Sequence, residues 1–364
     1  MSNRLVALLL TAFGFTLACL TPLDAQVSSH RTSSPYVILV MTDGFRWQEV
    51  FDGADPTLLA EAGADVRGAF IRDRPSERRA ALMPFVWETM ALHGQIFGDG
   101  RAGSEARLTN GFKFSYPGYN ETLTGHADPR VDSNDHASNE NRTVFEWLNT
   151  QPPMVGRVAA FATWKVFGRI FNTARSHLPL FDGSEPHERN GAQPPLYRQI
   201  MATIVDRIRG SVRDRLTHRA ADDYRRAANP RVTFIGYGET DRWAHADRYD
   251  RYLQSAHQVD EYLAELWASV QANPATRDST TLIVTTDHGR GAGRRWTDHG
   301  ADVEGAERIW IAVMGPGIPA LGVRQGVPTT QAQVAATVAA AVGFDWTTVE
   351  PRAAPALPVF SAKE

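Results

Sequence analysis

The feature that most constrains the fold is a set of short apolar runs, rich in β-branched residues and without alternating polar side chains. They span Tyr36 to Met41, Val155 to Thr163, Val232 to Gly238, Thr281 to Thr286 and Ile309 to Met314. Such runs are typical of strands that are covered on both faces. Helical patterns separate them, at Thr143 to Thr150, Tyr249 to Gln271 and Gln331 to Val342. The alternation predicts an α/β fold: a doubly wound, mostly parallel sheet with helices on both faces.

The N-terminal segment has the pattern of a secretory signal peptide. Arg4 precedes a short apolar stretch, Leu5 to Leu20, and a plausible small-residue cleavage site follows Ala25. Because the stretch is shorter than the roughly 20 residues of a membrane-spanning helix, we expect cleavage, then a periplasmic or secreted protein without a membrane span. A lipid anchor on Cys19, the only cysteine, is the less favoured alternative. Cleavage would leave a chain without disulfides or sulfur ligands.

Composition and charge limit the domain organisation and the partners that can be expected for the remaining chain. With 43% hydrophobic residues, residues 26 to 364 can bury a large core, and we predict one catalytic domain. The formal net charge of −3 and the absence of basic runs give no reason to expect nucleic-acid binding. Prolines and glycines between about residues 168 and 230, with an arginine-rich helix predicted at Tyr197 to Arg215, indicate an insertion that covers the site. An ordinary long connection is the alternative.

Carboxylates and imidazoles recur just beyond the carboxyl ends of predicted strands. These ends meet at one edge of a parallel sheet, so the side chains should converge there. Oxygen and imidazole ligands without sulfur suit zinc or manganese in an open catalytic site. The predicted ligands are Asp43, Asp287 and His288 for one ion, and Asp241, His245 and His299 for the other. Asp298 is predicted to orient His299 as a supporting partner rather than to bind an ion.

The order of these motifs resembles that of the alkaline phosphatase superfamily. That superfamily includes phosphatases, nucleotide pyrophosphatase/phosphodiesterases, sulfatases and cofactor-independent phosphoglycerate mutases. The resemblance extends from about Val37 to Gly317 and rests on Thr42-Asp43-Gly44, Asp241 with His245, Asp287-His288-Gly289 and His299. It implies an alkaline phosphatase-like fold and the same two ligand sets, with the nucleophile joining the Asp43 set. It also implies two divalent metal ions, zinc first and manganese as the alternative, and a small phosphate-ester substrate.

The resemblance points to Ser115 as the nucleophile. Phosphodiesterases of the superfamily show Thr-x-Pro-Asn, with Thr-Gly nine and ten residues beyond the nucleophile. Ser115 with Pro117 and Thr124-Gly125 has this spacing, whereas Gly118 replaces the asparagine. Ser115 would lie beside the amino end of a helix, where free amides favour a phosphate, and a bound metal would lower the pKa of its hydroxyl. A simple helix-capping role and Thr122 as the true nucleophile are the alternatives.

Three further residues bear on the substrate. Lys165 follows a predicted strand, where some bacterial alkaline phosphatases carry a Lys-x-Arg pair that contacts phosphoryl oxygens; Phe167 stands in place of the arginine. A lysine there favours a dianionic monoester over a diester, although a solvated loop lysine is also possible. Asn134 and Asn139 both lie where related enzymes place an asparagine donor, and the sequence does not decide between them.

The sequence therefore predicts an exported two-metal hydrolase of phosphate esters. It would act through a metal-activated Ser115 and a phospho-enzyme intermediate, with monoesters slightly favoured. The first alternative is a phosphodiesterase or nucleotide pyrophosphatase. A phosphoglycerate mutase-like phosphotransferase fits export poorly, and a sulfatase would need an arginine two residues beyond Pro117, where Tyr119 stands. A non-catalytic binding protein is disfavoured by the complete ligand set.

Overall fold

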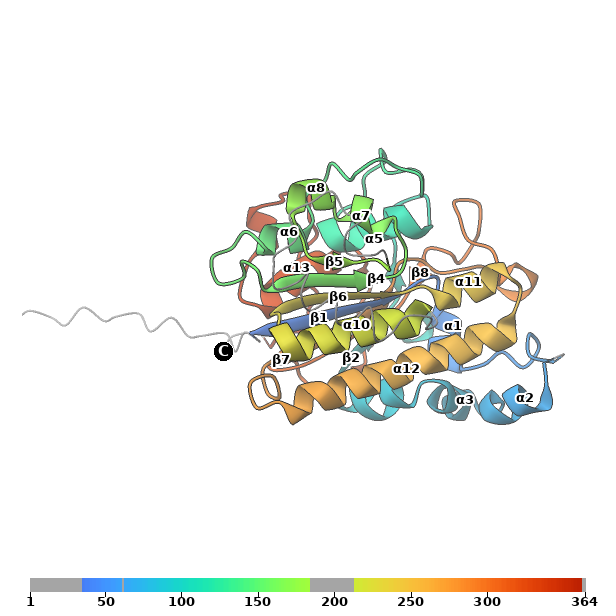
Figure 1. Cartoon of the computed structure of the whole chain (residues 1–364). Helices are drawn as coiled ribbons and strands as arrows, with labels where there is room; N and C mark the ends of the chain where they lie inside the picture. The colour runs from blue at the N-terminus through green and yellow to red at the C-terminus, as the bar shows by residue number, and fades with distance from the viewer. Residues whose placement is uncertain (1–34, 61, 184–212, 362–364) are drawn as a thin grey trace, which may run out of the picture. The chain divides into compact units, whose positions relative to one another are not determined.

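The computed structural model describes residues 35–60, 62–183 and 213–361. Helices cover both faces of an eight-stranded sheet with strand order β10-β2-β9-β7-β1-β6-β4-β5 (Figure 1). Its strands are β1 (Tyr36–Thr42), β2 (Gly94–Phe97), β4 (Val158–Ala162), β5 (Leu180–Phe181), β6 (Val232–Tyr237), β7 (Thr280–Thr286), β9 (Ile311–Met314) and β10 (Gly322–Val323). A smaller sheet comprises β11 (Thr329–Thr330), β3 (Ala106–Arg107) and β8 (Arg308–Ile309).

The centre of the large sheet is parallel, as predicted. β1 pairs in parallel with β6 on one side and β7 on the other, and β4 pairs in parallel with β6. β9 runs antiparallel to both β7 and β2. The strand predicted at Ile309 to Met314 is divided at Trp310, because β8 joins the small sheet and β9 the large one. The doubly wound α/β prediction is therefore confirmed, with an antiparallel strand near one edge.

Alternate side chains of β1 enter the two halves of the core. Val37, Leu39 and Met41 pack into one half, and Ile38 and Val40 into the other. The helices beside the first half are α5 (Ser115–Thr124), α6 (Val144–Leu148), α7 (Phe167–Ile170), α8 (Thr173–Ser176) and α13 (Gln333–Ala341). Those beside the second are α1 (Trp47–Asp52), α2 (Ala64–Phe70), α3 (Pro75–Leu82), α10 (Arg213–Ala228) and α12 (Tyr249–Ala272). Both faces of the sheet are thus buried, which explains the unbroken apolar runs.

The predicted helices are present with small differences at their ends. α12 matches its prediction within one residue, and its apolar positions at three- and four-residue steps, such as Leu253, Ala256 and Leu263, are buried. α6 begins one residue after Thr143, whose hydroxyl accepts the Glu146 backbone N–H and so caps the helix. The shorter helical segments are η1 (Val86–Met90), α4 (Ala91–His93), η2 (Gly100–Ala102), η3 (Gly293–Arg295) and η4 (Trp346–Thr348).

Both ends of the predicted insertion, about residues 168 to 230, belong to the main layers. β5 pairs with β4, and α10 packs against β4 and β6. Residues 184–212, which contain most of the helix predicted at Tyr197 to Arg215, lie outside the described residues, so their covering role stays a prediction. The signal peptide at residues 1 to 25 also lies outside them, and cleavage and export stay predictions.

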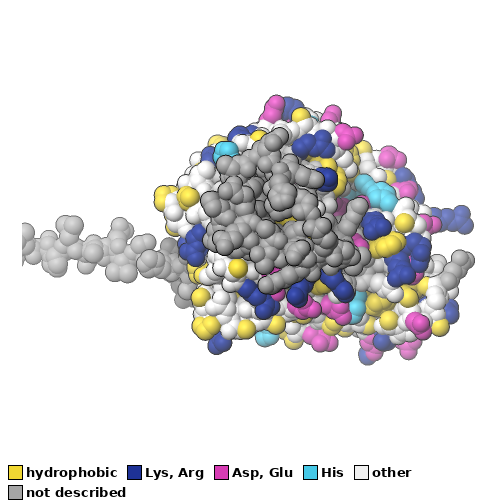
Figure 2. Space-filling view, viewed as in Figure 1, with side chains coloured by type: hydrophobic (Ala, Val, Ile, Leu, Met, Phe, Trp, Pro, Cys, Tyr) yellow, Lys and Arg dark blue, Asp and Glu magenta, His cyan; other side chains and the backbone are white. Residues whose placement is uncertain are grey.

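The described residues on the face seen in Figure 2 carry charges of both signs. In the view of Figure 2, basic and acidic side chains lie intermixed among the described residues, in keeping with the formal net charge of −3. Within the described part of the chain, none of the helices combines the length and the apolar character that a membrane crossing requires.

Candidate active site

Two loops and one short helix bring their acidic side chains to the carboxyl ends of adjacent strands in the large sheet. Asp43 directly follows β1, and Asp287 directly follows β7. Asp241 lies in α11 (Glu239–His245), the helix that follows β6. Because β1 pairs in parallel with both β6 and β7, the carboxyl ends of the three strands are adjacent. The sheet therefore assembles the three carboxylates that the sequence predicted to converge.

The first predicted ligand set lies together in a buried position. His288 Nε2 is 3.5 Å from Asp43 Oδ1 and 3.5 Å from Asp287 Oδ2. Ser115 Oγ lies 3.5 Å from the same Asp43 oxygen. The other oxygen of Asp287 accepts a hydrogen bond of 2.9 Å from the Gly44 backbone N–H, which fixes the direction of its carboxylate. These side chains form a compact group of the kind that can hold a metal ion.

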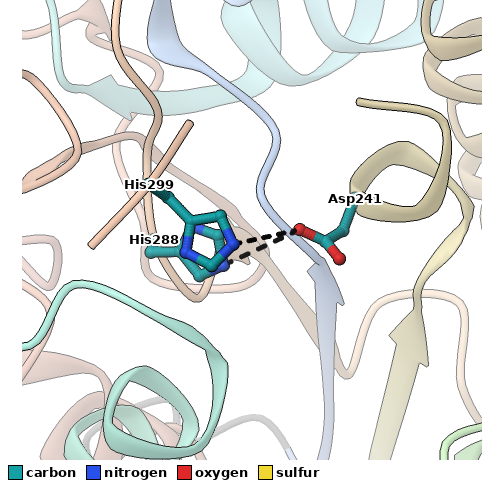
Figure 3. Close-up of side chains that lie close together, drawn as sticks. All are labelled: Asp241, His288 and His299. Carbon is teal, nitrogen blue, oxygen red and sulfur yellow. Dashed lines mark ion pairs between the residues drawn. The ribbon is translucent and has the colours of Figure 1, made fainter. Parts of the chain in front are cut away.

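The second predicted set adjoins the first. Asp241 Oδ1 is 3.4 Å from His245 Nε2 and 3.9 Å from His299 Nε2, and the two imidazole nitrogens are 3.0 Å apart. His288 lies between the sets: its Nε2 is 4.0 Å from Asp241 Oδ1, and its ring stacks on His299 with centroids 4.2 Å apart. Figure 3 shows both rings facing the Asp241 carboxylate. The two groups are close enough to serve two neighbouring cations.

The donor chemistry fits divalent metal ions. Asp287 Oδ2 and His288 Nε2 are buried and have no hydrogen-bond partner among the described residues, a costly state unless a cation binds them. His288 Nδ1 lies 2.8 Å from the Gly289 carbonyl. That contact places the ring proton on Nδ1 and leaves the lone pair of Nε2 free to bind a metal.

The electrostatics show how crowded these groups are. Burial, followed by the negative charge of Asp43, raises the pKa of Asp287 well above its ordinary value, and the same two causes raise the pKa of Asp241. Burial opposes the charged form of His288, but the charge of Asp287 and the contact with Asp43 raise its pKa to about 9. Burial and the nearby His288 lower the pKa of His299 to about 2. Bound cations would relieve the repulsion among the carboxylates.

Ser115 is the first residue of α5 and does not cap it. The capping position is Phe114, which makes no side-chain capping bond. The alternative nucleophile, Thr122, is fully buried and donates its hydroxyl to the Gly118 carbonyl inside the same helix. Of the sequence-based alternatives, only Ser115 therefore lies beside the acidic cluster, at the amino end of a helix.

Tyr119 is a site residue that the sequence analysis missed. It lies one turn beyond Ser115 on α5, and its hydroxyl donates a 3.0 Å hydrogen bond to Asp43 Oδ2. This bond occupies one Asp43 oxygen and leaves the other facing Ser115 and His288. The i, i+4 spacing from Ser115 was the available signal, because residues at that spacing share a helix face.

A cleft of about 290 Å³ opens beside the cluster. Its described lining is mixed, with polar and charged groups on one side and aromatic rings from the segment after β4. The lining residues are Asp43, Ser115, Tyr119, Asn134, Thr163, Trp164, Phe167, Gly236, Tyr237, Gly238, Asp241, Arg242, His245 and His299. Ser115, Asp43 of the first predicted ligand set and all three members of the second set therefore reach the cleft.

The structure separates the two candidate asparagines. Asn134 lines the cleft, and its Oδ1 accepts a 2.9 Å hydrogen bond from the Tyr116 backbone N–H. Asn139 is fully buried and donates instead to Asn120 Oδ1 and to the Ile170 carbonyl. Of the two alternatives, only Asn134 therefore lines the described cleft, whereas the Asn139 amide is used inside the protein.

Two other predicted site residues, Lys165 and Asp298, are exposed and do not line the described cleft. Lys165 is exposed and is not among the described residues of the cleft wall, where its neighbours Trp164 and Phe167 stand. Asp298 is exposed and pairs with Arg295 Nε at 3.0 Å rather than with His299. Lys165 does follow a strand, β4, as predicted, but for both residues the sequence did not reveal which way the side chain points.

Arg290 is the second residue that the sequence analysis missed. Its side chain is fully buried, donates to the Gly44 carbonyl at 3.1 Å, and forms an ion pair with Asp241. A buried arginine three residues beyond Asp287 has no sequence signature in a chain this rich in arginine.

Gly118 lets α5 approach the ligand loop closely. A Cβ at this position would lie 2.2 Å from the Asp287 carbonyl oxygen, well inside contact distance. The glycine that departs from the phosphodiesterase pattern therefore has a packing reason. Any larger residue would push the Ser115 helix away from Asp287.

With this geometry established, comparison with known proteins assigns the family. Residues 115–347 match the family model for type I phosphodiesterase / nucleotide pyrophosphatase. The chain belongs to this family. No curated protein matches it. This type I phosphodiesterase/nucleotide pyrophosphatase family member is thus a hydrolase of the alkaline phosphatase superfamily, as the motif order predicted.

Solved structures agree on the fold of this family member. An alkaline phosphatase, PafA, in a multiply substituted form, has a TM-score of 0.58 at 9% identity and covers 90% of this chain and 99% of its own. A phosphonate monoester hydrolase of Agrobacterium radiobacter has a TM-score of 0.51 at 14% identity, and the match covers 85% of this chain and 74% of the hydrolase. A 2-O GAG sulfatase has a TM-score of 0.52 at 13% identity, and the match covers 86% of this chain and 71% of the sulfatase. At these identities the likeness establishes the alkaline phosphatase-like fold alone.

Gly118→Ala should test the close packing of α5. Because the new methyl group would overlap the Asp287 carbonyl, we expect the free energy of unfolding to fall by about 1–3 kcal/mol, as measured by denaturant titration. Gly68→Ala is the matched control, since Gly68 is a helical glycine of α2 with no atom near the added Cβ. That variant should gain about 0.5–1 kcal/mol. Equal stability of the two variants would contradict the packing argument.

Proposed function

We propose that the protein hydrolyses phosphodiesters, with Ser115 as its nucleophile and two divalent metal ions, zinc or manganese, as cofactors. The observation that carries the proposal is the position of Ser115 Oγ, 3.5 Å from Asp43 Oδ1 at the start of α5. Ser115 lines the cleft together with Asp43 and with the second predicted ligand set. A nucleophile, a cation site and space for a substrate are thereby combined in one place.

The two ligand sets would divide the ions between them. Asp43, Asp287 and His288 would hold one ion together with Ser115 Oγ. Asp241, His245 and His299 would hold the other, with His288 also near Asp241 and His299. When bound, such ions lower the pKa of a ligated hydroxyl and stabilise charge on the attacking and leaving oxygens. Tyr119 supports the first set, because its hydrogen bond turns Asp43 Oδ1 toward Ser115 and His288.

The protein groups define a two-step reaction. Ser115 Oγ forms a bond to phosphorus while the bond from phosphorus to one ester oxygen breaks, and that oxygen takes up the proton given up by Ser115 and leaves as an alcohol. Water then attacks the same phosphorus, releases the phosphate monoester and restores the Ser115 hydroxyl. The Asn134 side-chain amide lines the cleft, and its Oδ1 is held by the Tyr116 N–H, so its NH₂ group is suited to donate to a non-bridging oxygen.

The preference for a diester revises the slight preference for monoesters drawn from Lys165. Its exposed side chain is absent from the described cleft wall, so the extra cation that would favour a dianionic monoester lacks support. Trp164 and Phe167 form an apolar wall instead, which suits the second ester group of a diester. Membership of the phosphodiesterase family points in the same direction.

Ser115→Ala should abolish turnover without unfolding the protein. Loss of the attacking oxygen should lower kcat/KM for bis(p-nitrophenyl) phosphate on the order of 10³-fold or more, while thermal melting stays close to that of the wild type. Thr122→Val serves as the control for the alternative nucleophile and should keep most activity. If Ser115→Ala stays active and Thr122→Val does not, the assignment fails.

Substrate preference should not depend on Lys165. We expect the ratio of kcat/KM for bis(p-nitrophenyl) phosphate to that for p-nitrophenyl phosphate to exceed one, and Lys165→Ala to leave it unchanged, because the lysine is exposed outside the cleft. Asn134→Ala should lower both rates by roughly 10- to 100-fold through loss of a hydrogen bond to a charged group. A wild type that prefers the monoester, together with a selective loss of monoester turnover in Lys165→Ala, would restore the original preference.

A further inference from the structure

Arg290 joins three of the loops that form the site. Its Nε donates to the Gly44 carbonyl at 3.1 Å, one Nη donates to the Thr297 carbonyl, and the other pairs with Asp241 Oδ1. The Arg290 side chain is fully buried, and its contact with the Gly44 carbonyl is buried with it. A single planar group therefore fixes the relative position of the loops after β1 and β7 and of α11.

The loop after β1 is shaped around this guanidinium. Gly44 has a φ of +59°, a conformation that non-glycine residues rarely adopt. A Cβ at Gly44 would also lie 2.9 Å from both Arg290 Nε and Nη2. Backbone conformation and space thus both require glycine here, so the residue after Asp43 accommodates the arginine.

Each Arg290 contact leads to a predicted metal ligand. Asp241 is itself a ligand of the second set, and Thr297 lies two residues before His299 in the same loop. Gly44 follows Asp43, and its N–H holds Asp287. The arginine therefore fixes Asp241 and the His299 loop against the backbone that carries the first set.

An electrostatic role and a positional role of Arg290 predict opposite changes in metal affinity when the arginine is removed. A guanidinium beside Asp241 repels a bound cation, so its removal should strengthen binding if electrostatics were its whole effect. If its role is positional, removal should weaken binding, because the ligand oxygen and the His299 loop lose their common anchor. The sign of the change in metal affinity therefore distinguishes the two roles.

We propose that Arg290 is a positioning residue that sets the geometry of Asp241 and His299 and thereby the affinity of the second ligand set for its ion. This inference rests on the proposed function only for the two-ion site, not for the substrate. Lysine cannot replace it, because an ammonium group cannot donate in the fixed planar fork that reaches all three acceptors.

The test is metal affinity in the absence of substrate. Zinc is titrated into metal-free Arg290→Lys and Arg290→Met in competition with a chromophoric chelator, with thermal melts of the metal-free proteins recorded alongside. We expect both variants to bind one of the two ions about 10- to 100-fold more weakly and the other with nearly wild-type affinity. Arg294→Lys and Arg294→Met are the matched controls, since Arg294 is exposed in the same loop, and they should bind like the wild type.

A double-mutant cycle identifies the affected ion. In a His245→Ala background, which already damages the second set, Arg290→Lys should add little further loss, whereas in an Asp287→Asn background its full effect should remain. Tighter zinc binding in Arg290→Met, wild-type binding in Arg290→Lys, or equal weakening of both ions would each overturn the inference. The assay contains no phosphate ester, so a failure of the phosphodiesterase proposal would leave its outcome unaffected.

Discussion

The structure depends on holding three carboxylates close together at a buried edge of the sheet. Asp43, Asp241 and Asp287 repel one another where little water can screen them. Parallel pairing of β1 with β6 and β7 forces the approach, and the Gly44 N–H and Arg290 partly offset its cost. The negative charge of these three carboxylates exceeds the positive charge that Arg290 and the Gly44 N–H place beside them. This imbalance is the physical reason that the cluster suits cations.

The nucleophile is brought to that cluster by close packing. Gly118 allows α5 to contact the Asp287 backbone, so the first turn of the helix places Ser115 against Asp43. The same helix supplies Tyr119 to the other Asp43 oxygen. One helix therefore contributes both the attacking group and the contact that orients a ligand carboxylate. A rigid attachment of this kind reduces the reorganisation needed before the chemical step.

Much of the fold and ligand set could be predicted because both follow from local patterns. Buried strands are visible as apolar runs, and Asp43, Asp241 and Asp287 are tied to the strand ends by position alone. Short strands such as β2 and β10 were missed, because two to four residues show no periodicity. Arg290 was missed for a different reason, since its three contacts come from segments far apart in the chain. Side-chain direction was the other gap: Lys165 and Asp298 occupy the expected loops but point to solvent.

Elemental analysis of the purified protein tests the central claim most directly. The account predicts about two divalent ions per chain in the wild type, and about one in a His299→Ala variant that leaves the first ligand set intact. Folding of that variant can be verified by circular dichroism. A wild type that holds one ion or none after reconstitution with zinc or manganese would contradict the two-ion site, and so would a His299→Ala variant that retains both ions.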